Sequence, residues 1–208
     1  MLLEVAGKQL PDDHDQLITF GVTEPFTTTM TVAAYGALVL SLPVLLWQLY
    51  AFVLPAFSRS ERRAVLPILV LFPILFLAGL AFAYFVVMPA AVNFLLNFND
   101  AQFNIQVRAR DYYGFFGMTM LAGGLVFQMP LLILALTRLN IVTTTQIARN
   151  RRYAYLAIAV LAAALPGIDP ISMLLEMIPL LVLFELSVAL SRLFDRRRAV
   201  SDLAEGST

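Results

Sequence analysis

The sequence contains no cysteine and a single histidine, His14. Without thiols, disulfide scaffolds, zinc–thiolate centres and thiol redox motifs are excluded. One imidazole also argues against a histidine-based metal or catalytic site. Charged residues are scarce at 13% of the chain, whereas apolar residues make up 60% and the mean hydropathy is +0.82. A soluble domain needs more polar surface than this, so we predict a protein that resides in a lipid bilayer.

The N-terminal segment lacks the positive charge and the apolar core of a signal peptide. Residues 1–24 carry one lysine, Lys8, and acidic residues at positions 4, 12, 13, 15 and 24. We therefore expect residues 1–26 to form a polar loop outside the membrane. Placing that loop there requires a further membrane helix upstream, so we expect that the chain lacks the true beginning of the protein.

Apolar stretches long enough to cross the bilayer, roughly 20 residues each, predict an all-α polytopic membrane protein with five transmembrane helices. These are expected at about 27–53, 64–96, 112–136, 153–165 and 171–190. Prolines at 67, 73 and 89 predict kinks in the second helix. The turn Pro166–Pro170 divides the last apolar block into a hairpin. We expect one domain, 1–208, with its membrane helices within 27–192, a tail at 193–208 and no structure after residue 198.

Basic residues are concentrated in alternate connections between these helices. Eleven of the fourteen lie in three groups, at positions 59, 62 and 63, at 138, 149, 151 and 152, and at 192, 196, 197 and 198. The positive-inside rule places these connections and the C-terminus in the cytoplasm, and the N-terminus of this chain outside. The other three basic residues are Lys8, Arg108 and Arg110.

Polar residues inside apolar helices are candidates for function, because an ionisable group costs several kcal/mol in a membrane. Glu185 and Gln128 lie well within such runs, and Glu176 lies nearer the outer end of the last helix. Glu185 could instead make a buried hydrogen bond between helices, and a structural role is favoured for Glu176, which can reach interfacial water. Asp169 in the hairpin turn has a simpler interpretation, since an aspartate followed by Pro170 is typical of a helix start.

Glu61 is the only acidic residue in the first basic connection, between Arg59 and Arg62. It could form a solvated ion pair of little energetic weight, or it could present a carboxylate to a cationic ligand. The sequence shows no nucleophile–base pair, paired catalytic carboxylates, phosphate loop or metal-ligand cluster. An enzymatic activity is therefore not expected.

Several motifs follow one another in a characteristic order. They are Thr23-Glu24-Pro25-Phe26, the run Phe52–Phe57 (FVLPAF) with Glu61-Arg62-Arg63, the run Phe76–Gly79 (FLAG) with Phe82–Pro89 (FAYFVVMP), and Pro166–Asp169 (PGID) with Pro179 and Phe184-Glu185. In this order they resemble the TatC family, the core receptor subunit of the twin-arginine protein translocase. The resemblance covers nearly the whole chain.

The resemblance implies a six-helix bundle with a concave, cupped face, of which five helices are present here. It implies a multi-pass protein of the bacterial cytoplasmic membrane that binds signal peptides carrying paired arginines. Its implied partners are the single-helix subunits TatA and TatB, other TatC copies and the lipid bilayer. Export of folded proteins would be driven by the proton-motive force, so we expect no cofactor and no nucleic-acid partner.

The resemblance also assigns roles to individual residues. Glu61 would bind the arginine pair, because guanidinium groups bind carboxylates in a bidentate manner, and Phe52 would belong to the same site. Gln128 and Glu185 would form an intramembrane polar face that contacts partner helices. Pro43, inside the first span, and Asp169, in the outer turn, would be structural.

Two departures from the family pattern bear on these roles. We expect this chain to lack the family's first helix, together with the cytoplasmic segment that supplies a second part of the signal-binding surface. Many relatives carry glutamate at the position of Gln128, and glutamine cannot titrate. The alternative to a receptor is a secondary transporter in which Gln128, Glu176 and Glu185 line a solute or proton path.

Overall fold

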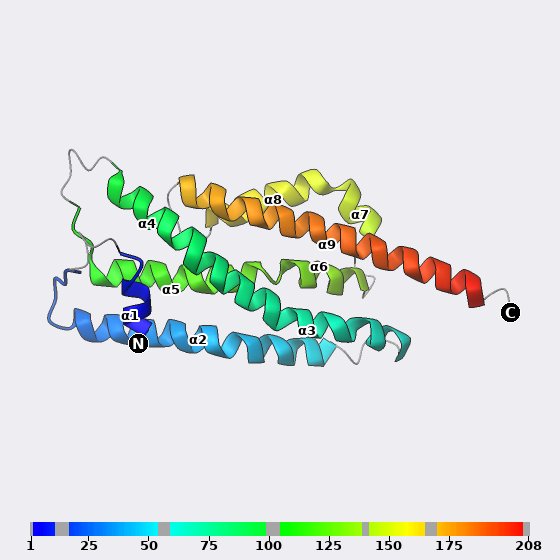
Figure 1. Cartoon of the computed structure of the whole chain (residues 1–208), viewed down its shortest axis with the longest axis horizontal. Coiled ribbons are helices and arrows are strands. Elements are labelled where there is room, and N and C mark those ends of the chain that lie inside the picture. Colours follow the sequence, from blue (N-terminus) through cyan, green and yellow to red (C-terminus); the bar gives the residue numbers. More distant parts are fainter. Residues whose placement is uncertain are drawn as a thin grey trace.

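The structure, a computed structural model, describes residues 2–10, 17–53, 59–98, 105–138, 142–164 and 170–205. The regular elements of these ranges are helices (Figure 1): α1 (Leu2–Gly7), α2 (Glu24–Val53), α3 (Arg59–Phe82), the π-helix η3 (Ala83–Val87), α4 (Met88–Asn97), α5 (Ala109–Val126), α6 (Met129–Arg138), α7 (Thr144–Arg149), α8 (Arg151–Ala164) and α9 (Pro170–Glu205). The predicted all-α membrane fold is confirmed.

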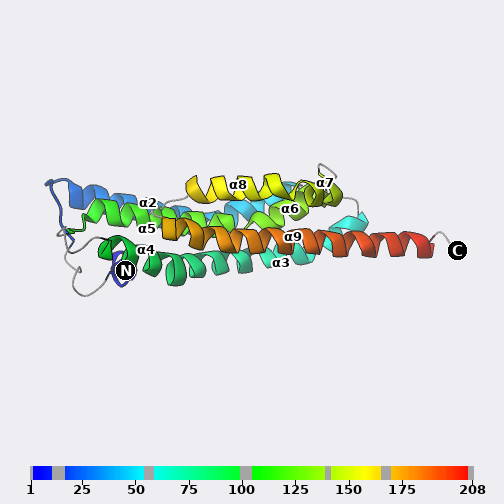
Figure 2. The same ribbon diagram turned by 90° about the horizontal axis from the view of Figure 1, so that it is seen from above.

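The long helices lie lengthwise in an elongated bundle. In Figure 1, α5 and α6 run between α2 and α9, and the α3–η3–α4 helix crosses obliquely in front of them. Seen from above in Figure 2, α8 and the α3–α4 helix lie on opposite sides of α9. The starts of α3 and α8 and the C-terminal part of α9, which carry the basic groups, lie at one end, called here the arginine end. The starts of α2 and α5 lie at the other, called here the Glu24 end.

Three described stretches are long and apolar enough to cross a membrane, at 24–48, 71–97 and 109–137. They coincide with the first three predicted spans. Helix α8 has 14 residues and so extends only about 21 Å, which agrees with the short hairpin arm expected from the sequence. One expectation was wrong: α9 continues to Glu205, so the chain is helical beyond residue 198.

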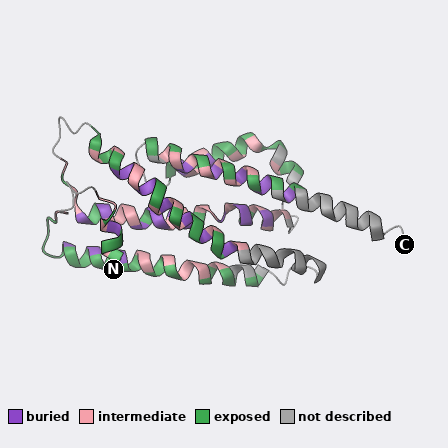
Figure 3. Ribbon diagram, viewed as in Figure 1, coloured by how far each residue is buried: buried purple, intermediate pink, exposed green. Residues whose placement is uncertain are grey.

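Exposed side chains on the outside of the bundle are often large and apolar, as expected for surfaces that face lipid. Leu40 is 76% exposed, and Leu77 and Val160 are each 62% exposed. Figure 3 shows exposed residues along the outer faces of α2 and α8 and buried residues where the helices face one another. This pattern is expected for a protein whose outer surface contacts the hydrocarbon of a lipid bilayer.

The second long helix changes its hydrogen bonding before Pro89. Over η3 the helix widens, and the N–H of Met88 donates to the carbonyl of Ala83, five residues earlier. Pro89 has no N–H, so it cannot continue the α-helical ladder toward Phe85, and the wider π turn absorbs this interruption. Pro43, in contrast, lies inside the single helix α2.

Helices α3 and α5 approach closely where both carry small residues. A Cβ atom on Gly123 would lie 2.7 Å from Cβ of Ala83 and 2.9 Å from the carbonyl oxygen of Gly79. A Cβ on Gly79 would in turn collide with the carbonyl oxygen of Gly123. Gly79 and Ala83 are four residues apart, the spacing that lets membrane helices bring their backbones together. We call these three residues the small-residue seam.

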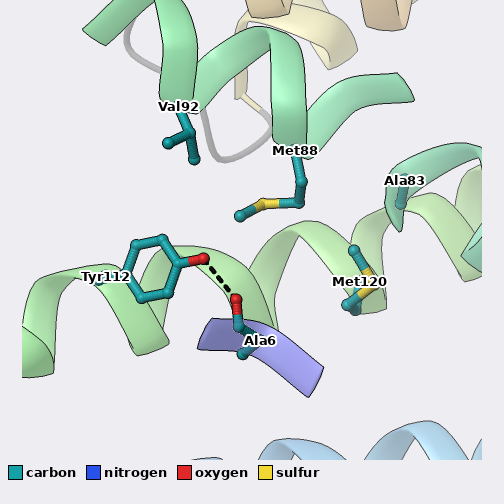
Figure 4. Close-up of a cluster of buried hydrophobic side chains, with 6 residues drawn as sticks. All are labelled: Ala6, Ala83, Met88, Val92, Tyr112 and Met120. Carbon is teal, nitrogen blue, oxygen red and sulfur yellow. Dashed lines mark hydrogen bonds between the residues drawn. The ribbon is translucent and has the colours of Figure 1, made fainter. Parts of the chain in front are cut away.

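Buried side chains next to the seam form the core. Ala6, Ala83, Met88, Val92, Tyr112 and Met120 cluster between α1, the α3–η3–α4 helix and α5 (Figure 4). Met88 and Ala6 are 0% exposed. The core therefore joins the short N-terminal helix to two of the membrane spans.

Gly123→Val should weaken the bundle, because its side chain would enter the space of Ala83 and the Gly79 carbonyl. Overpacking of this kind costs about 1–3 kcal/mol, so we expect a lower midpoint of thermal unfolding in detergent. Gly114→Val is the matched control: it lies in the same helix, and an added Cβ there meets no atom within 4 Å. Equal destabilisation by both variants would show that valine in α5, and not the seam, is responsible.

Candidate functional site

Three tyrosines hold α1 against the bundle. The hydroxyl of Tyr112 donates to the carbonyl of Ala6 over 2.6 Å, and this bond is drawn in Figure 4. Tyr84 and Tyr113 donate to the carbonyls of Val5 and Leu3 over 3.1 and 3.5 Å. The Ala6 carbonyl also accepts from the N–H of Gln9 over 3.2 Å, so the tyrosine hydroxyls add tertiary hydrogen bonds to a helix too short to be stable alone.

An ion pair joins α2 to the start of α5 at the Glu24 end. Arg108 Nε lies 2.7 Å from Glu24 Oε1, and Arg108 Nη2 lies 3.2 Å from Glu24 Oε2, which is a bidentate geometry. The N–H of Phe20 donates to Glu24 Oε2 over 2.9 Å, and the guanidinium carbon lies 5.4 Å from the Phe20 ring centroid. The hydrogen bond to Glu24 raises the pKa of the Arg108 guanidinium above its ordinary value.

The backbone reinforces the same junction. Ile18 N–H donates to Val107, and Ala109 N–H donates back to Ile18, each over 3.0 Å. The segment before α2 is thereby tied to the segment before α5. The pair also explains why Arg108 lies outside the three groups of basic residues. Its charge is neutralised at this end by the carboxylate of Glu24, a residue that is only 5% exposed.

The candidate residues of the first basic connection lie at the arginine end. Phe52 is in the last turn of α2 and is 83% exposed. Glu61 is the third residue of α3. Because α2 ends and α3 begins at this end of the bundle (Figure 1), the two positions belong to one corner of the molecule. Asp169 lies outside the described residues, and Pro43 is within α2.

Glu185 faces the neighbouring arm of the hairpin. Arg151 Nη2 lies 3.1 Å from Glu185 Oε2, and the Tyr155 hydroxyl donates to Oε1. The Glu185 side chain is 40% exposed and that of Arg151 is 37% exposed. The carboxylate therefore binds groups of its own chain, and its contact with a partner helix stays a prediction.

Gln128 lies in the turn that separates α5 from α6, just before Pro130. It is 7% exposed, and its Nε2 makes one long bond of 3.4 Å to the carbonyl of Gly124. Among the described residues, its Oε1 has no hydrogen-bond partner. A buried acceptor without a partner is costly, which makes Gln128 a position where a polar group of another helix would be stabilising.

The polar candidates are not gathered in one site. Gln128 contacts Gly124 of α5, whereas Glu185 contacts α8. Glu176 is 8% exposed and lines a small pocket beside Thr119 and Pro179. The described part of the chain holds no group of three or more potential metal ligands.

The sequence matches the family described as "Sec-independent protein translocase protein (TatC)" over residues 2–179. This chain belongs to the TatC family. The TatC protein of Carboxydothermus hydrogenoformans is 37% identical over 178 residues, which cover 85% of this chain and 73% of that protein. TatCy of Bacillus subtilis is 35% identical, with 95% of this chain and 79% of the relative covered. Escherichia coli TatC is 35% identical, with coverages of 90% and 72%.

Comparison with solved structures supports the same family assignment. A crystal structure described as "Twin Arginine Translocase Receptor- TatC in DDM" has 30% sequence identity and a TM-score of 0.79, covering 91% of this chain and 86% of that one. TatC proteins are multi-pass components of a protein translocase in the bacterial inner membrane and are not enzymes. Between the two functions that the sequence left open, the comparisons thus favour the translocase subunit over the secondary transporter.

Replacing either member of the Glu24–Arg108 pair by glutamine should lower the thermal stability in detergent, because the other charge loses its partner. The double variant should be less destabilised than the sum of the two single variants. Arg110→Gln, two residues further along at an exposed position, should have little effect. Strictly additive losses would mean that the two side chains do not interact in the membrane protein.

Proposed function

We propose that this chain recognises twin-arginine signal peptides and organises the proton-motive-force-driven export of folded proteins across the cytoplasmic membrane. The observation that carries the proposal is the likeness, in both sequence and fold, to a solved twin-arginine translocase receptor. Names of the relatives support the same process, since they are Sec-independent protein translocase proteins.

The signal peptide binds at the corner between α2 and α3. An arginine pair needs a carboxylate at the membrane surface, and Glu61 is the acidic residue in the first turn of α3. Two guanidinium groups can share one carboxylate through charge-assisted hydrogen bonds. The exposed ring of Phe52 offers an apolar surface for the residues beside the arginine pair.

The arginine end faces the cytoplasm and the Glu24 end faces the periplasm. Support comes from the three basic groups, which the fold brings to one end (Figure 1). Signal peptides begin their route in the cytoplasm, so this orientation puts Glu61 on the side from which they arrive. The C-terminus is cytoplasmic by the same argument.

Partner subunits contact the intramembrane polar residues. TatA, TatB and other TatC copies are the partners that family membership suggests. Gln128 supports this role because its buried Oε1 has no hydrogen-bond partner among the described residues. Glu185 would contribute from the α8–α9 hairpin, where part of its carboxylate is exposed beside Arg151.

Glu61→Lys should abolish recognition of the arginine pair, because it replaces an attractive carboxylate by a repelling ammonium. A hydrogen bond to a charged group contributes about 1.5–3 kcal/mol, so crosslinking of a twin-arginine signal peptide to the chain in membrane vesicles should fall by roughly tenfold or more. Wild-type crosslinking should fall similarly when the peptide carries paired lysines, since lysine lacks the planar fork.

Glu205→Lys is the matched control, because it makes the same change of charge at the last residue of α9. It should crosslink as the wild type does, and both variants should insert into the membrane. Crosslinking of Glu61→Lys at the wild-type level, or indifference of the wild type to paired lysines, would refute the assignment.

A further inference from the structure

A pocket of about 520 Å³ opens between the end of α6, α7, the start of α8 and α9. Most of its lining is apolar, and we call this apolar part the floor; it consists of Ile133, Leu136, Val142, Ile147, Ala154 and Phe184. Polar side chains, those of Gln146, Asn150 and Tyr153, also line it. The pocket is separate from the corner of α2 and α3 that carries Glu61.

The position of the pocket relative to the membrane follows from the helices that line it. Ile133 and Leu136 belong to the last turns of the apolar stretch 109–137. Helix α7 follows that stretch and is fixed by a capping box between Thr143 and Gln146. The floor of the pocket thus lies where the hydrocarbon region ends, and its polar lining lies toward the headgroup region.

Positive charge borders the polar side of the pocket. Arg149 and Arg152 are both exposed, and each is adjacent in the sequence to a lining residue, Arg149 to Asn150 and Arg152 to Tyr153. Arg152 Nη2 donates to the Tyr153 hydroxyl over 3.2 Å, and its guanidinium carbon lies 4.8 Å from the Tyr153 ring centroid. This contact holds one cation beside a residue that lines the pocket.

The arginines at positions 149, 151 and 152 differ in their ion pairing. Arg151, which lies between the two exposed arginines in the sequence, pairs with Glu185. Neither α7 nor α8 contains an acidic residue. Arg149 and Arg152 thus leave a net positive charge at the mouth of an apolar pocket, which suits a ligand with a negative headgroup and an apolar tail.

We propose that this pocket binds one anionic phospholipid, with the phosphate at Arg149 and Arg152 and the beginning of an acyl chain on the floor at Ala154 and Phe184. Charge complementarity supports this occupant, because the exposed Arg149 and Arg152 border a pocket whose lining is mostly apolar. Polar side chains of Gln146 and Asn150 can donate to the ester and phosphate oxygens.

The test is the retention of lipid by the purified chain. The chain is reconstituted with equal amounts of phosphatidylglycerol and phosphatidylcholine, extracted in mild detergent, and the bound phospholipids are identified by native mass spectrometry. We expect retention of phosphatidylglycerol in preference to phosphatidylcholine. An arginine near an anionic surface contributes about 1 kcal/mol, so Arg149→Gln and Arg152→Gln should each lower retention roughly fivefold. Ala154→Trp, which fills the floor, should lower it with both arginines present.

Matched controls separate the pocket from general charge and bulk. Lys8→Gln with Arg110→Gln removes two charges at the Glu24 end, and Ala157→Trp adds the same bulk at an exposed position of α8. Both controls should retain phosphatidylglycerol as the wild type does. The proposal is overturned by equal retention of the two lipids, by equal losses in the arginine variants and the charge control, or by unchanged retention in the arginine variants. If Ala154→Trp fails to fold, the two arginine variants decide.

Discussion

The close approach of α3 and α5 at the small-residue seam is the constraint on which the rest of the bundle depends. In a bilayer the hydrophobic effect does not drive helices together, so backbone proximity and van der Waals contact must do so. The seam allows this because Gly79 and Gly123 have no side chains to separate the two backbones. Phe76 then packs against the face of Gly124, and Tyr35 of α2 packs against Gly117 on the same helix α5. Helix α5 is thereby the element on which α2 and α3 both rest.

The two ends of the bundle are built for different purposes. At the Glu24 end, a bidentate ion pair, two backbone hydrogen bonds and three tyrosine hydroxyls fix the segments that precede α2 and α5. At the arginine end, exposed groups such as Phe52 and Arg152 are available to bind other molecules. Under the proposed function, the more tightly bonded Glu24 end would hold the shape of the bundle while the arginine end accepts the signal peptide.

Sequence patterns predicted those parts of the fold that depend on local composition. Apolar runs located the three long spans, Pro166–Pro170 indicated the hairpin, and the motif order indicated the family that the comparisons confirmed. The interior of α3–α4 was only partly predictable: Pro89 indicated a distortion, but whether the helix kinks or widens depends on its packing against α5. The helical end of α9 was missed because a charged, small-residue stretch resembles a disordered tail.

Contacts between distant residues could not be predicted in this way. Glu24 and Arg108 are 84 positions apart, and the sequence offered only the hint that Arg108 broke the pattern of basic residues. Glu185 was expected to face a partner, but its observed contacts are Arg151 and Tyr155, brought near by the hairpin. No residue spacing indicated that tyrosines of η3 and α5 would bind the carbonyls of α1. The roles of Glu61 and Phe52 came from family resemblance, because composition alone favoured a solvated ion pair for Glu61.

Disulfide crosslinking across the seam tests its geometry most directly, because the chain has no cysteine of its own. The rings of Phe82 and Phe127 lie 5.6 Å apart between centroids, and a Cβ on Gly79, three residues before Phe82, would lie 2.9 Å from the Cβ of Phe127. The backbones are therefore close at this point, and Phe82→Cys with Phe127→Cys should form a disulfide on mild oxidation in native membranes. Phe82→Cys with Met118→Cys, nine residues and about 13 Å further along α5, should not. A bond in the second pair, or none in the first, would contradict the packing of α3 on α5 from which the rest of the fold follows.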